Sequence, residues 1–381
     1  MILTTDQQQI ANAVSDFATD VLAPNYQRRE QLGVLDRELV KQMGSLGFLG
    51  SDLPENLGGL GLDAVTAGLI AERMAYGDFN LSALPVNVSL LGAIISRHAS
   101  ADIQAQWLPE MVAGRAIVAI CLTEPRGGSD AAALQMRARR DGDDYLLNGE
   151  KASITFADCS DASVVFARTD HGERANGVSA FFVPHDLPGI SRGRYDDLGS
   201  TVIGRGSIFY DDVRIPARYR LGDEGQGFTQ VMQGFDYSRA LIGLQCCGAA
   251  QASLDEAWAY SKEREAFGRP IAQFQGVSFP LAEAESTTAA IRQLCYHTLA
   301  LRDADLPHTA EAAMCKWMGP RKAVETIHQC LLTFGHYGWS KDLPHQQRLR
   351  DVMGLEIGDG TAGIMKQIIA KERVGRAAIQ Y

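Results

Sequence analysis

The chain has 381 residues, of which 46% are hydrophobic and 22% are charged, and its formal net charge at pH 7 is −10. This length predicts two or three domains, and the acidic balance argues against a nucleic-acid surface, which needs a basic stripe. The seven cysteines contain no CxxC pair, so we expect reduced thiols and neither a zinc site nor a thioredoxin-type site. The polar N-terminal segment does not resemble a signal or transit peptide, and no apolar run is long enough to span a bilayer. A cytoplasmic protein is expected.

Residues 1–115 are expected to form an α-helical domain. Apolar residues recur with the spacing of one helix face in four segments, residues 5–21, 36–46, 64–76 and 84–97. A loop rich in glycine and proline, residues 53–63, separates the second of these segments from the third.

Residues 116–226 are expected to form a β-rich middle domain, and residues 227–381 a helical bundle. Runs typical of strands lie at residues 117–122, 145–149, 162–169, 178–184 and 207–216. The pair Asn148-Gly149 predicts a tight turn between strands. Long amphipathic segments follow at residues 239–264, 276–302, 307–335 and 361–376.

The segment CLTEPRGGSD, residues 121–130, directly follows a run typical of a strand. Its glycines and small polar residues let the backbone approach a planar or anionic ligand closely. In isolation such a stretch is more often a plain turn. No βαβ pattern surrounds it, so it is not a dinucleotide-binding GxGxxG motif.

Six motifs in fixed order together resemble the acyl-CoA dehydrogenase family. They are PENLGGLG (54–61), CLTEPRGGSD (121–130), NGEKASIT (148–155), FDYSR (235–239), REAFGRPIAQFQ (264–275) and RDVMGLEIGDGT (350–361). The resemblance covers nearly the whole chain. It implies an α+β multidomain fold with an α-helical N-domain, a β-barrel-like middle domain and a C-terminal four-helix bundle. It also implies bound FAD, no metal, a homotetramer, and electron-transfer flavoprotein as the electron acceptor.

By this resemblance, Thr123 would hydrogen-bond the flavin ring, and Arg264 would pair with the pyrophosphate of FAD in a neighbouring subunit. Without the motif, Arg264 would be interpreted as a solvated helix residue. His336 stands where the family often has glycine, and we expect it to pack or to lie at the adenine edge. The implied cofactor residues are Ile120, Cys121, Leu122, Thr123, Gly128, Ser129, Ser153, Ile154, Thr155, Arg264, Phe267, Phe274, Gln275, Leu332, Gly335, His336, Thr361 and Gly363.

The resemblance implies that Asp359 is the catalytic base, because it stands where the family usually has a glutamate. In isolation, an aspartate in a Gly-Asp-Gly loop would be interpreted as a turn residue. Ser238 occupies the position of the base in some branched-chain members and cannot serve as one. Asp236 and Arg239 would face CoA, although a local ion pair near a helix start is an equal alternative. The implied substrate-side residues are Ser129, Asp236, Ser238, Arg239, Gly358 and Gly360.

Three departures from the family pattern suggest an acyl group that is bulky at the α-carbon. Asp359 is one methylene shorter than the usual glutamate, Gly358 replaces a bulky aromatic residue, and Ser153 replaces a tryptophan that is common beside the flavin. The last two changes remove volume near the reacting carbons. Family members that act on cyclic acyl-CoA thioesters place aspartate at this site. We therefore expect an alicyclic or α-branched substrate such as cyclohexanecarbonyl-CoA.

Three alternatives remain open from the sequence. A flavin oxidase of the same fold, similar to nitroalkane oxidases, would also carry an aspartate base, although the Asp236 and Arg239 pair favours CoA. A dehydrogenase of acyl groups bound to a carrier protein would share every motif. A flavin-binding scaffold without activity is disfavoured by the retained carboxylate at position 359.

Overall fold

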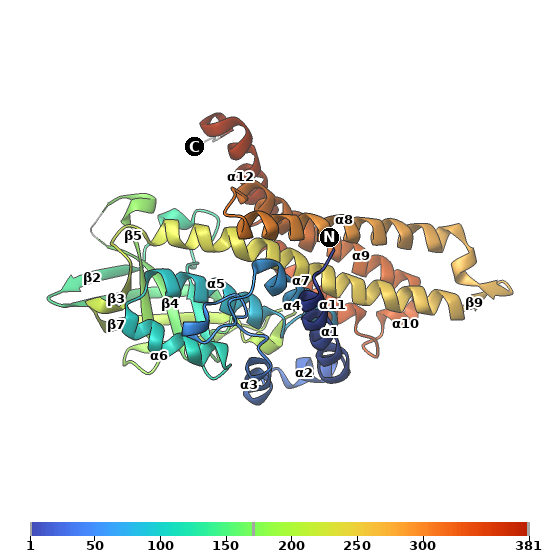
Figure 1. The fold of residues 1–381 in the computed structure, drawn as a ribbon, viewed down its shortest axis with the longest axis horizontal. Coiled ribbons are helices and arrows are strands. Elements are labelled where there is room, and N and C mark those ends of the chain that lie inside the picture. Colours follow the sequence, from blue (N-terminus) through green and yellow to red (C-terminus); the bar gives the residue numbers. More distant parts are fainter. Residues whose placement is uncertain (1, 170–171, 379–381) are drawn as a thin grey trace.

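The computed structural model describes residues 2–169 and 172–378 and shows helices at both ends of the chain with a β-sheet between them. The molecule is elongated, with the sheet at one end and the long C-terminal helices running toward the other (Figure 1). The predicted order of a helical, a sheet-containing and a second helical part is confirmed. None of the helices in the described ranges combines the length and the hydropathy that a transmembrane span needs.

The N-terminal part is built from helices whose starts are fixed by capping side chains. Thr4 and Gln7 form a reciprocal capping box at the first helix. Asp36 and Asp63 accept hydrogen bonds from backbone N–H groups at the starts of two others. Such caps stabilise a helix start by about 1 kcal/mol each. The helices are α1 (Thr5–Phe17), α2 (Tyr26–Leu32), α3 (Arg37–Ser45), α4 (Ala64–Gly77), α5 (Ala83–His98) and α6 (Ala101–Val112).

The middle part forms a sheet with the strand order β6-β7-β3-β2-β4-β5-β8, and β1 pairs in parallel with β4. The strands are β1 (Val118–Cys121), β2 (Arg137–Asp141), β3 (Asp144–Ile154), β4 (Ala162–Arg168), β5 (Val178–Pro184), β6 (Ile190–Arg194), β7 (Gly206–Pro216) and β8 (Arg220–Leu221). Both faces of β5 are buried. Phe182 packs against Trp107 of α6 with ring centroids 4.9 Å apart, and Phe181 packs against Tyr145 of β3 at the same distance.

The predicted turn at Asn148-Gly149 is wrong, because both residues lie inside β3 at a shift in its register with β7. Gly149 has a φ of 146°, and a Cβ atom there would lie 2.9 Å from the side chain of Met136. The Asn148 side chain pairs across the bulge with Asp212, donating to its carboxylate at 2.8 Å and accepting from its N–H at 3.0 Å. A bulge and a tight turn both need the backbone freedom of glycine, so the dipeptide Asn148-Gly149 does not distinguish a bulge from a turn.

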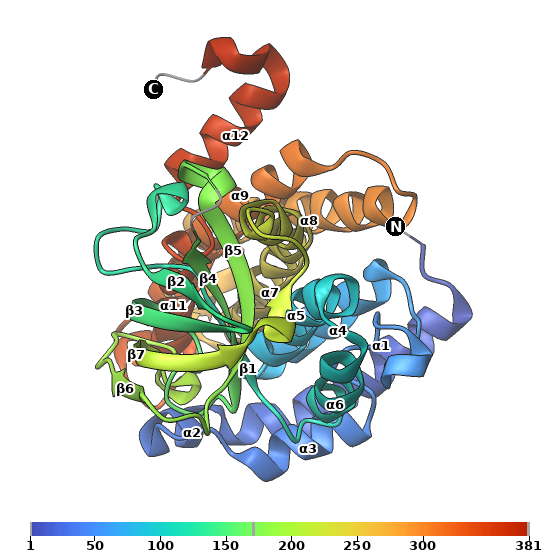
Figure 2. The ribbon, with the colours of Figure 1, turned by 90° about the vertical axis from the view of Figure 1, so that its left-hand side faces the viewer.

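The C-terminal part surrounds one long central helix, α7, which contacts α4, α5, α8 and α9 (Figure 2). At the contact with α9, a Cβ atom on Gly319 would lie 2.8 Å from the Cα atom of Gly243, so the two backbones touch. The sequence predicted that this helix begins at residue 239, but it begins at Gly227, so FDYSR lies within the helix and not at its start. The elements are α7 (Gly227–Glu263), β9 (Glu265–Ala266), β10 (Arg269–Pro270), α8 (Gln275–Asp303), α9 (Thr309–Thr333), α10 (His336–Trp339), α11 (His345–Met353) and α12 (Ala362–Val374).

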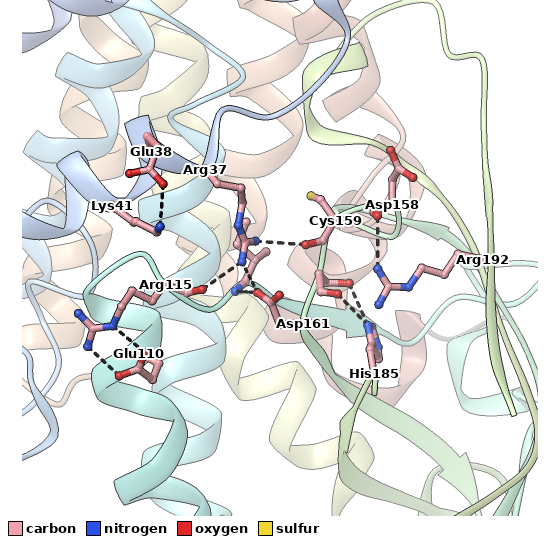
Figure 3. A network of polar contacts seen from close by, with 12 residues as sticks. Arg37, Glu38, Lys41, Glu110, Arg115, Asp158, Cys159, Asp161, His185 and Arg192 are labelled. Carbon is pink, nitrogen blue, oxygen red and sulfur yellow. Dashed lines mark hydrogen bonds and ion pairs between the residues drawn. The ribbon is translucent and has the colours of Figure 1, made fainter. Parts of the chain in front are cut away.

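Arg37 of α3 joins the N-terminal helices to the sheet (Figure 3). Its guanidinium donates to the carbonyl oxygens of Arg115 at 3.0 Å and Cys159 at 3.2 Å, and it pairs with Asp161 at 2.6 Å. The same carboxylate oxygen of Asp161 accepts a hydrogen bond from the N–H of Ile117 at 2.7 Å. One arginine therefore fixes the chain segment that enters β1.

We expect the region around His185 to lose folding stability at acidic pH. His185 lies between Ser160 and Ser163, with ring nitrogens 3.1 Å from the Ser160 carbonyl oxygen and 2.9 Å from the Ser163 hydroxyl. Burial, followed by the nearby Arg192, lowers the pKa of His185 to about 4. The unfolded chain then binds more protons between pH 6.5 and 4, so stability is lost as pH falls through this window.

We expect His185 to contribute up to about 2 kcal/mol of stability that is present at pH 7.5 and lost at pH 5. The measurement is urea denaturation of the wild type and the His185→Gln variant at both pH values, because Gln cannot titrate. The stability difference between the two proteins should shrink by about that amount at pH 5. A His297→Gln variant, at an exposed histidine, is the control. A constant difference at both pH values would contradict the prediction.

Candidate active site

Asp359 lies in a loop between a short 3-10 helix, Gly354–Glu356, and α12. Asp359 has a φ of 54° and Gly360 a φ of 104°, so two consecutive residues adopt the left-handed region. A Cβ atom on Gly360 would lie 2.5 Å from the flexible end of the Met365 side chain, and the φ of 104° itself strains any residue other than glycine there. Thr361 caps α12 by accepting from the N–H of Ile364. A left-handed conformation at a non-glycine residue costs of order 1–3 kcal/mol and persists where its surroundings enforce it.

The loop follows α11, which is fixed by the buried carboxylate of Asp351. This carboxylate accepts hydrogen bonds from the hydroxyl of Tyr26 at 2.5 Å, the side-chain amide of Asn80 at 3.0 Å and the N–H of Ser200 at 2.5 Å. Its three donors come from the N-terminal helices and the middle part. Burial raises the pKa of Asp351 to about 6 despite these bonds. Asp351 therefore joins all three parts of the chain eight residues before Asp359.

The Asp359 side chain is half-buried and makes no hydrogen bond within the described part of the chain. The Asp359 carboxylate interacts electrostatically with two basic side chains, Arg239 of α7 and Lys316 of α9. Burial lowers the pKa of Arg239, and the carboxylates of Asp236 and Asp359 partly offset this effect. The site therefore combines a carboxylate that has no hydrogen-bond donor of its own with two buried positive charges.

The Asp236 and Arg239 pair, predicted to face CoA, forms an ion pair of 3.0 Å within α7. The other oxygen of Asp236 accepts from the hydroxyl of Thr309 at 2.7 Å. Arg239 is 3% exposed, and its Nε–H has no partner among the described residues. Ser238 is fully buried, and its hydroxyl lies 3.5 Å from the carbonyl oxygen of Phe235. The structure therefore shows a local ion pair and an internal serine at these positions.

Two of the predicted cofactor segments are held together by a buried ion pair. Lys151 of β3 is fully buried and lies 2.8 Å from Glu124, which is itself 8% exposed. Glu124 accepts from the N–H groups of Gln135 and Met136, and Lys151 also donates to the carbonyl oxygen of Leu122. The loop that follows β1 is thus closed at its base. A further bond of 2.9 Å joins the N–H of Ala152 to the carbonyl oxygen of Thr123.

The tip of this loop and the end of β3 present backbone to solvent. Gly128, Ser129 and Ser153 are exposed, and Thr123 and Thr155 are half-buried. Of the other residues in these two segments that were predicted to contact the cofactor, Cys121, Leu122 and Ile154 are buried and Ile120 is half-buried. Burial raises the pKa of the Cys121 thiol to about 11, so at neutral pH it is an unreactive thiol in the core.

Ser153 adopts a φ of 57°, and its N–H lies 3.5 Å from the hydroxyl of Tyr195. That hydroxyl also lies 2.7 Å from the hydroxyl of Ser207. The sequence analysis did not identify Tyr195, which is 37% exposed. A tyrosine ring therefore lies beside the position where the family often has tryptophan.

A third set of predicted residues meets in an open groove at the far end of α7. The groove has an empty volume of about 990 Å³ and is lined by Tyr260, Arg264, Ile271, Thr333, Phe334, Gly335, His336 and Tyr337. Arg264 forms no salt bridge with any described residue. Phe267, at the hairpin tip, is 95% exposed and packs only edge-on against Phe274, with ring centroids 6.0 Å apart. Gln275, Leu332 and Gly363 are also exposed.

The groove and the exposed loop of the middle part lie at opposite ends of the molecule (Figure 1). The start of α7 packs on β5, where a Cβ atom on Gly227 would lie 2.6 Å from the backbone of Ser179. Its other end leads into Arg264. A helix of 37 residues spans about 55 Å. Within one copy of the chain, the two sets of residues are therefore separated by much of the length of α7.

These residues fit FAD if two copies contribute. Exposed backbone and small side chains at Gly128 and Ser129 leave room for a flat ring, because a Cβ atom on Gly127 would meet no atom within 4 Å. Arg264 offers an unpaired guanidinium, the group best suited to a pyrophosphate. The described residues contain no group of His, Cys, Asp or Glu placed to hold a metal ion.

The family profiles and the relatives that match this chain all belong to one protein family. Profiles described as acyl-CoA dehydrogenase N-terminal, middle and C-terminal domains match residues 4–115, 119–213 and 225–373. The short-chain specific acyl-CoA dehydrogenase of Rattus norvegicus mitochondria is 35% identical over 370 residues, which cover 97% of this chain and 90% of that protein.

Solved structures agree. Butyryl-CoA dehydrogenase from Megasphaera elsdenii superposes with a TM-score of 0.95 at 31% identity, covering 98% of this chain and 99% of that chain. PigA, solved with FAD and proline, superposes with a TM-score of 0.95 at 28% identity, covering 99% of each chain.

Proposed function

The chain belongs to the acyl-CoA dehydrogenase family and is an FAD-dependent oxidoreductase, and from this premise we propose that it oxidises an acyl-CoA thioester between the α- and β-carbons. Asp359 removes the α-proton. FAD supplies the acceptor for the hydride that leaves the β-carbon. The observation that carries this proposal is a carboxylate without hydrogen-bond donors, held in a left-handed loop and interacting electrostatically with two buried basic side chains.

The chain's own groups support removal of an α-proton. A base must be unprotonated and free to approach the substrate, and no described residue occupies the Asp359 carboxylate by a hydrogen bond. Arg239 and Lys316 are the buried basic side chains that interact electrostatically with Asp359. The N–H of Asp359 has no acceptor in the described part of the chain, so it can donate to the thioester oxygen, where negative charge develops.

We further propose an alicyclic or α-branched acyl group such as cyclohexanecarbonyl. Gly358 directly precedes the base and has no steric need to be glycine, because a Cβ atom there would lie 3.6 Å from the Gly354 carbonyl oxygen and 3.9 Å from Leu355. These are ordinary contacts, so a larger residue would fit the backbone. Because residue 358 is glycine, the space that a larger side chain would fill next to Asp359 is left free. This free space suits a substrate with a ring at the α-carbon.

Filling this space should change the substrate preference. We expect Gly358→Tyr to lower kcat/KM for cyclohexanecarbonyl-CoA by about 10- to 100-fold, the effect of overpacking by 1–3 kcal/mol, and to alter that for octanoyl-CoA much less. The control is Gly354→Ala in the short 3-10 helix that precedes the loop, where an added Cβ atom meets nothing within 4 Å. Equal losses for both thioesters in the Gly358 variant would contradict a role in ring selection.

We propose that the protein is a homotetramer and that electron-transfer flavoprotein accepts its electrons. The separation of the two FAD-facing sets along α7 supports assembly, because each cofactor then needs a second copy. Exposed apolar side chains on the C-terminal part also support it, namely Phe267, Phe279, Leu332, Tyr337 and Trp339. The acceptor follows from the family resemblance.

The test is anaerobic titration of the purified yellow protein with cyclohexanecarbonyl-CoA, cyclohex-1-ene-carbonyl-CoA and octanoyl-CoA, following the visible flavin absorbance. The proposal predicts bleaching by cyclohexanecarbonyl-CoA. Bleaching by octanoyl-CoA alone would keep the dehydrogenase and overturn the ring. If no thioester bleaches the flavin, the function fails. Oxygen consumption with nitroalkanes, or bleaching by a carrier-protein thioester, would then identify the replacement.

A further inference from the structure

We infer that Lys316 is a positioning residue for the proposed base: its ammonium group closes the Asp359 loop and places a buried positive charge near this carboxylate. The inference rests on the proposed function of Asp359. It concerns a residue on a different element, α9, whose ammonium group donates to backbone carbonyl oxygens of the segment around Asp359.

The Lys316 ammonium lies inside the protein, with the residue 1% exposed. Its Nζ atom donates to the carbonyl oxygen of Leu355 at 2.7 Å and to that of Gly360 at 2.8 Å. These two carbonyls stand at the two ends of the loop, and Gly360 directly follows Asp359. One cation therefore ties both ends of a six-residue segment to α9 and fixes the left-handed backbone between them.

Burying the Lys316 ammonium group is unfavourable for the free energy of folding, so a contribution to stability alone does not explain this residue. Burial lowers the pKa of Lys316, and the negative charge of Asp359 is the largest effect that opposes this shift. Cys246 and Glu356 act in the same direction as Asp359, whereas Arg239 acts against them. Lys316 forms no salt bridge with the described residues. An amine that only closed a loop would be replaced at lower cost by a neutral donor, since isolated buried charges are strongly unfavourable.

The charge of Lys316 and its hydrogen bonds can be separated by two substitutions. Lys316→Gln keeps N–H donors on the side chain and removes the charge, whereas Lys316→Met removes both. The matched control is Lys322→Met on the same helix, because Lys322 is half-buried at the surface and its ammonium group forms an ion pair with Glu325. FAD content and oligomer size are measured first, so that variants with a disrupted fold are recognised.

The readout is hydrogen exchange into 3-thiaoctanoyl-CoA in deuterium oxide, followed by mass spectrometry. Sulfur at the β position carries no hydride, so exchange at the α-carbon reports proton removal alone. We expect exchange to slow by about 10- to 100-fold in both Lys316 variants, the size of effect that misplacement of a catalytic group produces. The pH profile of exchange in Lys316→Gln should differ from that of the wild type, because the variant lacks the charge. The Lys322 control should match the wild type.

The possible outcomes separate the inference from the proposed function. A wild-type rate and pH profile in Lys316→Gln, with a slow rate in Lys316→Met, would overturn the charge role and leave only a loop-closing donor. Wild-type exchange in both variants would overturn the whole inference. Undiminished exchange in Asp359→Asn would instead show that the proposed base is wrong, whatever the Lys316 variants do.

Discussion

Asp359→Asn is expected to lower kcat for thioester oxidation by about 10³-fold or more, while FAD content and assembly stay unchanged. General base catalysis contributes about 10²- to 10⁴-fold, and no other described carboxylate lies in this loop next to both buried cations. The Asn side chain has nearly the same shape and tolerates the left-handed backbone, so the loop should remain folded. The measurement is the single-turnover rate of flavin bleaching in anaerobic stopped flow.

The matched variant is Asp359→Glu, which keeps a carboxylate and lengthens it by one methylene. We expect it to retain activity and to favour straight-chain over ring thioesters, because the longer side chain reaches further into the space beside Gly358. Activity in Asp359→Asn within tenfold of the wild type would contradict the assignment of the base. In that case another group would have to take the α-proton.

The second large effect is expected at the base of the flavin-facing loop. Lys151→Met should destabilise the protein by about 3–5 kcal/mol and abolish FAD retention, because it leaves Glu124 buried without its cation. The loop that carries Thr123 and Ser129 depends on this carboxylate for its two backbone bonds to Gln135 and Met136. Urea denaturation and the flavin absorbance of the purified protein measure the two effects.

Two comparisons isolate the buried charge as the cause. The double variant Glu124→Gln with Lys151→Met should recover part of the lost stability, because it removes the uncompensated carboxylate. Lys41→Met, which breaks the exposed pair with Glu38, should cost no more than about 1 kcal/mol. If Lys151→Met and Lys41→Met had equal effects, the ion pair would not be what holds this loop.

Element type and order were predictable where the hydrophobic period was strong. The segments 64–76 and 84–97 correspond to α4 and α5, and the runs at 162–169 and 178–184 correspond to β4 and β5. β2 was missed because RARRD, an exposed strand, carries almost no apolar residues. The early turns of α7 were missed because glycine and polar residues interrupt its period before residue 239.

Of the site, the motifs identified the loops but not the residues that hold them. Lys316 and Lys151 were not singled out, since a lysine in sequence is usually a solvated side chain. One signal was present for Lys316, because it falls between buried Ala312, Ala313, Cys315 and Gly319 on the apolar face of its helix. The local ion pair that was an equal alternative for Asp236 and Arg239 is present, but the bond from Thr309 to Asp236 joins residues far apart in sequence and needed the structure.

The most direct test of the account is anaerobic mixing of cyclohexanecarbonyl-CoA with the wild type and with Asp359→Asn, followed by the visible flavin absorbance. We expect rapid bleaching of the wild type, formation of cyclohex-1-ene-carbonyl-CoA, and no bleaching of the variant on the same timescale. Equal bleaching of both proteins would contradict the role of Asp359, and no bleaching of either would contradict the ring substrate.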